Sequence, residues 1–317
     1  MSALPASVEA ILDRGELCYV AANARHGPHV TPTVFALVAG RVWVTTSRAS
    51  VKARAWRADP RAAGLVRVGE VALSFAGSVR TYDALEVEAL LPNLLDAPVL
   101  ALAWVRFARK NARFFAGYAL DAHHVPLAWT PPARVFTAIE IERAAIVGPE
   151  GVAETFGAWP RRTASVRRFR ATRGPVPILE ALPEDVREPL GEVGHGALAL
   201  EGEHGLVVLP VGWVAERGFL YAAAARGTLA LAGAERPRVP AALAMDRASW
   251  WRARHMVGAM VRGEAELAVV AELTSGVRSA TTIARAAGVA DDAAVARMLP
   301  ERVVWWRGWT SGTVAVP

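Results

Sequence analysis

The feature of this sequence that most restricts its fold is an internal repeat. Residues 18–53 (CYVAANARHGPHVTPTVFALVAGRVWVTTSRASVKA) have a counterpart in residues 196–231 (GALALEGEHGLVVLPVGWVAERGFLYAAAARGTLAL). In register, Gly27 matches Gly205 and Pro32 matches Pro210. Each copy reads as a strand, a His-Gly turn, a strand containing proline, a glycine turn and an aromatic strand. A pattern that recurs in this way predicts one structural unit built twice.

The local patterns favour β-structure in both copies. Runs rich in valine, threonine and aromatics, separated by turn signals at residues 25–28 and 39–40, predict three antiparallel strands after a helix over residues 8–15. Further strands are expected at residues 62–68, 71–75, 82–89 and 134–141, and helical spacing marks residues 92–120. In the second half, residues 257–266, 280–298 and 302–309 are matched to the strand at 82–89, the helical segment and the strand at 134–141.

These patterns predict a mainly β protein with helices, of the α+β class, made of two tandem β-barrels. The expected domains are a first barrel with a helical insertion over residues 1–148, a basic linker over residues 149–190 and a second, degenerate barrel over residues 191–317.

The composition and charge limit which ligands, partners and locations are expected. The net charge of +6 and the pI of about 10.2 favour anionic ligands, but the basic residues are dispersed, so nucleic-acid binding is not expected. The apolar runs are too short to span a bilayer and the N-terminus has no basic segment, so neither membrane nor secretion is expected, and a cytoplasmic location is the default. A single cysteine, Cys18, excludes an internal disulfide, and the scattered histidines predict no metal site.

One stretch carries the chemistry of a phosphate site. The β-rich run VWVTTS at residues 42–47 ends in hydroxyls, and a basic segment with helical spacing follows at once. Hydroxyls and backbone N–H groups at a helix N-terminus can donate to phosphate oxygens, and a lysine supplies the counter-charge. The second copy has Ala222–Ala225 in place of the hydroxyls and lacks the lysine, which predicts a single site, in the first copy. The residues concerned are Thr45, Thr46, Ser47, Ser50 and Lys52.

Three segments resemble one known family. GPHVTPTVF (residues 27–35), VWVTTS (42–47) and SVKARAWRADPRA (50–62) are similar to the pyridoxamine 5'-phosphate oxidase-like split-barrel superfamily, which includes flavin- and deazaflavin-dependent oxidoreductases. The resemblance implies six-stranded split barrels that work in pairs, with FMN or the deazaflavin coenzyme held between them. It also implies an oxidoreductase acting on a small molecule, here with the two barrels of one chain as an intramolecular pseudo-dimer. Further homo-oligomerisation is left open.

The resemblance also assigns roles residue by residue. It gives the phosphate to the five residues named above, and the flavin ring to the strand containing His29, Thr31, Pro32, Thr33 and Val34. This sequence departs from the family pattern at Arg48 and Ala49, which interrupt the hydroxyls. Candidates for a wall supplied by the second barrel are Trp213, Trp250, Trp251, Arg252 and Arg254.

Other functions stay open at this stage. No residue set indicates acid–base or nucleophilic catalysis, so the catalytic residues are unknown; this is compatible with a cofactor that carries the chemistry. Some split barrels bind haem, for which His29, His195 or His204 could be the axial ligand. A regulator without turnover is the third class, because residues 280–299 resemble a helix-turn-helix, although Asp291 and Asp292 are unfavourable for binding DNA.

Overall fold

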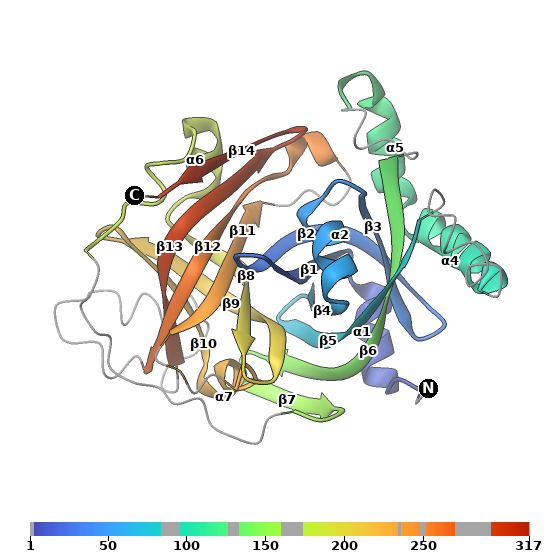
Figure 1. Ribbon diagram of the computed structural model, residues 1–317, viewed down its shortest axis with the longest axis horizontal. Helices are drawn as coiled ribbons and strands as arrows, with labels where there is room; N and C mark the ends of the chain where they lie inside the picture. Colours follow the sequence, from blue (N-terminus) through green and yellow to red (C-terminus); the bar gives the residue numbers. More distant parts are fainter. Residues whose placement is uncertain are drawn as a thin grey trace.

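The structure, a computed structural model, describes residues 3–83, 96–125, 133–159, 174–233, 236, 238–247, 252–269 and 293–316. It contains two antiparallel sheets, each curled into a barrel, which stand side by side (Figure 1). The first has the strand order β3-β2-β1-β4-β5-β6-β7, and pairing of β3 with β6 closes six of the strands into a ring. Its strands are β1 (Leu17–Ala24), β2 (Gly27–Val38), β3 (Arg41–Ser47), β4 (Arg61–Val68), β5 (Val71–Tyr82), β6 (Arg134–Gly148) and β7 (Gly151–Phe156).

The second sheet repeats this plan. Its order is β10-β9-β8-β11-β12-β13-β14, closed by pairing of β10 with β13. The prediction of two tandem split barrels in a mainly β chain is therefore confirmed. The strands are β8 (Val193–Gly202), β9 (Gly205–Glu216), β10 (Phe219–Ala225), β11 (Arg238–Arg247), β12 (Val257–Val269), β13 (Ala293–Arg307) and β14 (Thr310–Ala315).

The first hairpins of the two barrels have the same register. Ala24 pairs with Gly27 in one and Gly202 with Gly205 in the other. Both glycines have positive φ, 93° and 91°, a conformation that side chains other than glycine rarely adopt. The sequence match of Gly27 with Gly205 is thus a match of turn geometry.

Later parts of the repeat differ from the sequence alignment. β5 is one strand from Val71 to Tyr82 where two were expected, and its counterpart is β12; residues 84–89 lie outside the described part. Because the bulge at Ala76/Gly77 corresponds to that at Arg262/Gly263, residues 293–300, and not 302–309, match residues 134–141. The segments before β6 and β13 differ in length, so a similar apolar pattern was aligned out of register.

The segment that resembled a helix-turn-helix is partly a strand. Residues 293–299 belong to β13, while residues 280–292 lie outside the described part. Within the residues expected to form the linker, β7 pairs with β6, and α6 (Glu184–Leu190) forms a short helix. The basic run at residues 161–173 lies outside the described residues.

Helices cover the ends and one flank of the first barrel. α1 (Ala6–Arg14) and α2 (Val51–Ala58) add buried side chains to the barrel interior. α4 (Ala97–Lys110) and α5 (Ala112–Leu120) stand on the outer flank (Figure 1), where Phe107 packs on Trp43 and Phe136, as expected for a helical insertion. The remaining described helices are η2 (Ala122–His124), α7 (Arg226–Ala230) and η5 (Ala253–His255). None of the described helices has both the length and the apolar character needed to cross a bilayer.

The barrels pack through a dry, shared core. Val30 and Leu65 of the first barrel form one buried cluster with Val208, Ala244 and Met260 of the second. Polar contacts cross the same interface, including Tyr19 Oη to Asp246 Oδ1 at 2.9 Å and Ser74 Oγ to the Val208 carbonyl at 2.7 Å. The two barrels therefore form an intramolecular pair.

Candidate functional site

β2 and β3 separate along half of their length. They pair only between Phe35–Val38 and Arg41–Val44, whereas β2 remains paired with β1 as far back as Gly27. Residues 27–34 of β2 and 45–47 of β3 consequently line an opening in the first barrel, which we call the open edge. Eight of the ten residues assigned to cofactor binding lie on it.

The backbone of β2 is suited to this position. The Val30 N–H group donates to Met260 Sδ of the second barrel at 3.3 Å. Because backbone groups alternate in direction along a strand, residues 28, 30 and 32 turn their backbone toward the open edge. Two of these are Pro28 and Pro32, which have no N–H group and are tolerated in a sheet only where no ladder partner is needed.

The helix that follows β3 is fixed by the predicted hydroxyls. Ser50 is the N-cap of α2, and its Oγ accepts a hydrogen bond from the Ala53 N–H group at 3.0 Å. The Thr46 hydroxyl lies 2.9 Å from the same Ser50 Oγ. These two hydroxyls thus define where α2 begins, and they place Lys52 in its first turn.

Lys52 is the centre of the site. Its side chain is only 7% exposed, and Nζ donates to Thr31 Oγ1 across the open edge at 2.8 Å. Burial lowers the pKa of Lys52 to about 8, Cys18 opposes this shift and Arg134 adds to it. Among the described residues, no carboxylate lies within 4 Å of the amine. A buried ammonium group without a counter-ion is costly, and an anionic ligand would relieve that cost.

Arg134 is a second cation that the sequence did not reveal. It begins β6 opposite Ser47, and its guanidinium donates to Thr45 Oγ1 at 2.7 and 3.2 Å and to the Thr45 carbonyl at 2.9 Å. Burial lowers the pKa of Arg134. Since the Thr45 hydroxyl accepts from Arg134, its own hydrogen is available to donate to an anion.

His29 is neutral at physiological pH. Burial is the main cause that lowers the pKa of His29 to about 3, and the charges of Lys52 and Arg262 contribute to the same shift. Arg262 belongs to β12, so the imidazole lies in the electrostatic field of both barrels. A neutral imidazole offers one hydrogen-bond donor and one acceptor.

The other predicted residues do not all share one face. Thr45 and Ser47 alternate with Thr46, so their side chains leave β3 on opposite faces. Val34 is buried under α4 and presents only its backbone to the open edge. Pro32 and Thr33 are partly buried on β2, with the Thr33 hydroxyl 3.4 Å from the Val34 carbonyl.

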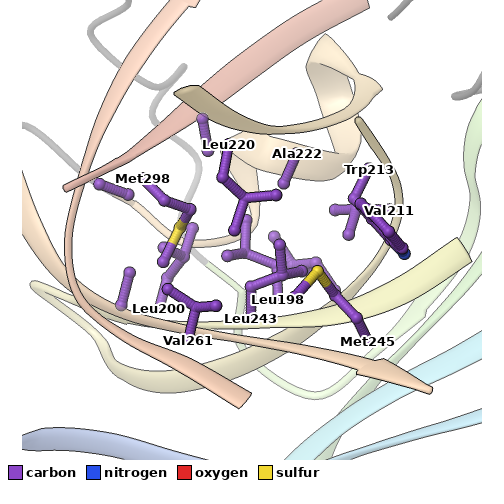
Figure 2. Packing of buried hydrophobic residues seen from close by; sticks show 14 of the residues in the cluster. Leu198, Leu200, Val211, Trp213, Leu220, Ala222, Leu243, Met245, Val261 and Met298 are labelled. Atoms are coloured by element: carbon purple, nitrogen blue, oxygen red, sulfur yellow. The ribbon is translucent and has the colours of Figure 1, made fainter. Parts of the chain in front are cut away.

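The residues expected to form a wall from the second barrel have other roles. Trp213 is 2% exposed inside the second barrel, where Figure 2 shows it beside Val211, so it is a core residue. Arg252 and Arg254 each reach within 3.6 Å of Asp121 Oδ1 at the end of α5. Trp250 and Trp251 lie outside the described residues. Of the haem candidates, His195 and His204 are exposed on the second barrel.

The corresponding positions of the second barrel are apolar. The hairpin register equates His29 with Val207 and Thr31 with Leu209, and both aliphatic side chains are fully buried in the core cluster that Figure 2 shows in part. The β3–β6 and β10–β13 ladders equate four further polar residues of the first barrel with alanines. These pairs are Thr45 and Ala223, Thr46 and Ala224, Ser47 and Ala225, and Arg134 and Ala293.

Comparison with known proteins gives structural matches only. No protein-family model and no curated protein sequence matches this chain. Similar solved structures include an FMN-binding, pyridoxamine 5'-phosphate oxidase-related protein from Nostoc punctiforme (14% identity, 48% of this chain and 86% of that one, TM-score 0.35). Others are an FAD-binding protein from Mesorhizobium loti (17%, 45% and 94%, TM-score 0.30) and a putative pyridoxamine 5'-phosphate oxidase from Listeria innocua (13%, 44% and 94%, TM-score 0.28). Each match spans about half of this chain, and the assignment of the fold rests on the strand order.

Proposed function

We propose that this chain binds FMN at the open edge of the first barrel and acts as an oxidoreductase on a small molecule. The observation that carries the proposal is Lys52, a buried amine that bonds Thr31 across the opening and has no carboxylate within 4 Å among the described residues. The phosphate of FMN is a dianion at neutral pH and would supply the missing counter-charge.

The residues present fit such a ligand. Lys52 and Arg134 provide positive charge, and the hydroxyls of Thr31 and Thr45 provide further polar contacts. The backbone of Pro32 and Val34 and the neutral imidazole of His29 continue along the opening. FMN supplies hydride chemistry when bound, and the chain's own residues bind and orient it. The deazaflavin coenzyme also carries phosphate, so the same cations would serve it.

The test is reconstitution of the purified chain with FMN and, separately, with the deazaflavin coenzyme. We expect the absorbance of one of them to remain with the protein after gel filtration. Lys52→Met should weaken binding by roughly 30-fold or more, because removal of one partner from a buried charge pair costs about 2–5 kcal/mol. A protein that binds neither coenzyme would overturn the proposal.

Lys110→Met is the matched control. Burial also lowers the pKa of Lys110 to about 8, but its amine donates to the Leu12 carbonyl between α4 and α1. We expect this variant to keep the affinity of the wild type. Equal losses in both variants would place the effect of Lys52 in general stability.

A further inference from the structure

Arg262 of the second barrel faces the open edge of the first. Met260 lies two residues before it on β12 and accepts the hydrogen bond from Val30 N–H, so its side chain points at β2. Residues two apart on a strand share a face, and the β-bulge follows Arg262, so Arg262 points the same way. On the neighbouring β11, Pro240 lies close to Gly27 at the other end of this stretch: a Cβ at Gly27 would be 3.5 Å from Pro240 Cβ.

The Arg262 guanidinium has no close counter-charge among the described residues: the exposed Glu301 raises its pKa, but burial and Arg302 lower it by more. The residue is 8% exposed, and no carboxylate lies within 4 Å of it among the described residues. Its cross-strand partner is another cation, the exposed Arg302. The charge of Arg262 also lowers the pKa of His29, so the second barrel contributes a third cation near that imidazole, in addition to Lys52 and Arg134 of the first barrel.

Comparison of the two barrels shows that the arginine lies beside the polar open edge and not beside the equivalent apolar edge. The bulges equate Arg262 with Ala76 of β5, and Met260 with Ser74. The contact of Val30 with Met260 is accordingly repeated by the bond from Ser74 Oγ to the Val208 carbonyl. Ala76 thus faces the second barrel's counterpart of the open edge, where Val207 and Leu209 replace His29 and Thr31. Arginine therefore faces the polar edge, and alanine stands at the equivalent position beside the apolar one.

We propose that Arg262 binds the anionic part of the ligand, so that the second barrel completes the site of the first. The inference rests on the proposed function in that it takes the ligand to carry a phosphate. It assigns a role to the second barrel, whose own strands carry alanine or aliphatic side chains at the positions equivalent to the polar residues of the open edge. The chain would then work as an asymmetric pair, with one binding edge made from both halves.

The test uses inorganic phosphate as the probe and the thermal unfolding midpoint of the whole chain as the readout. Wild-type protein should gain several degrees in phosphate relative to chloride at equal ionic strength. Arg262→Met should lose at least half of that gain, while its midpoint in chloride stays equal to or above that of the wild type. Arg302→Met, which changes the neighbouring exposed arginine, should behave like the wild type.

Three results would overturn the inference: no phosphate gain in the wild type, a full gain in Arg262→Met, or a fall of several degrees for Arg262→Met in chloride, which would mark a structural role. Titration of the same proteins with FMN and the deazaflavin coenzyme separates this inference from the proposed function. If phosphate stabilises through Arg262 but neither coenzyme binds, the cofactor assignment fails and the anion site stands.

Discussion

The two barrels share the same strand arrangement, but the positions that are polar at the open edge of the first barrel are apolar in the second. In the first, β2 and β3 separate around His29, Thr31 and Thr45, and in the second the equivalent positions are Val207, Leu209 and Ala223. Both barrels close with the same strand order. The polar residues are therefore not needed to form a barrel, and their presence in one copy calls for a functional reason.

The energetics support this interpretation. Replacing buried charges by apolar side chains of similar size is often neutral or stabilising. A pKa of about 8 for Lys52, against 10.5 for an ordinary lysine, means that the folded chain holds this amine charged at neutral pH at a cost of up to about 3 kcal/mol. A residue that lowers the stability of the fold, as a buried charged lysine does, is expected mainly at a functional site.

The largest expected effect comes from giving the first barrel the residues of the second. The triple variant His29→Val, Thr31→Leu and Lys52→Ala should fold, resist urea as well as the wild type or better, and lose FMN binding altogether. Urea unfolding followed by FMN titration measures both properties. A variant that fails to fold would break the comparison, since it would show that the first barrel needs its polar interior.

The second test is the pH dependence of stability without ligand. The pKa of Lys52 is lower in the folded chain than in the unfolded one, so the unfolded chain binds more protons between about pH 8 and 10.5. Stability should therefore rise with pH across that window, by up to about 3 kcal/mol from this group. Lys52→Met should remove that part of the rise, and it should be the more stable protein at pH 7.

Lys110 titrates over the same window, because burial lowers its pKa to about 8 as well. The comparison is therefore made between Lys52→Met and Lys110→Met, each of which should remove one contribution. An unchanged pH profile in Lys52→Met would contradict a buried, charged Lys52.

The smallest effect concerns the helix that carries Lys52. α2 has Ser50 as a side-chain cap, whereas α7 in the second barrel spans five residues and begins after Ala225 without one. Ser50→Ala should cost about 1 kcal/mol in urea unfolding and weaken FMN binding a few-fold, because the first turn is less well fixed. Ser311→Ala, at an exposed position on β14, serves as the control and should change neither quantity by a measurable amount.

The sequence predicted the parts of the fold that depend on local pattern. Alternating apolar residues define the strands, and the glycines Gly27 and Gly205 define the turns between them. These local signals predicted the repeat, the two barrels and the first three strands of each barrel. The register of the match between β6 and β13 was wrong: residues 302–309 were aligned with residues 134–141, which residues 293–300 match. The segments before these two strands differ in length, and no local pattern measures that difference.

The residues of the candidate site also differ in whether the sequence alone could reveal them. Lys52 and the hydroxyls of Thr45, Thr46 and Ser50 were visible because they follow one another in the chain. Arg134 and Arg262 come from strands far away in sequence, and their burial follows from barrel closure and from packing between the barrels. Nothing in the residues around them distinguishes them from surface arginines.

The central claim is one anion-binding edge per chain, and the stoichiometry of FMN binding tests it most directly. An ordinary symmetric pair of split barrels would offer two equivalent sites, whereas here one edge is polar and the other apolar. Calorimetric titration of the whole chain should give one FMN per chain in the wild type and no measurable binding in the triple variant. Two FMN per chain, or one that persists in the triple variant, would contradict the account.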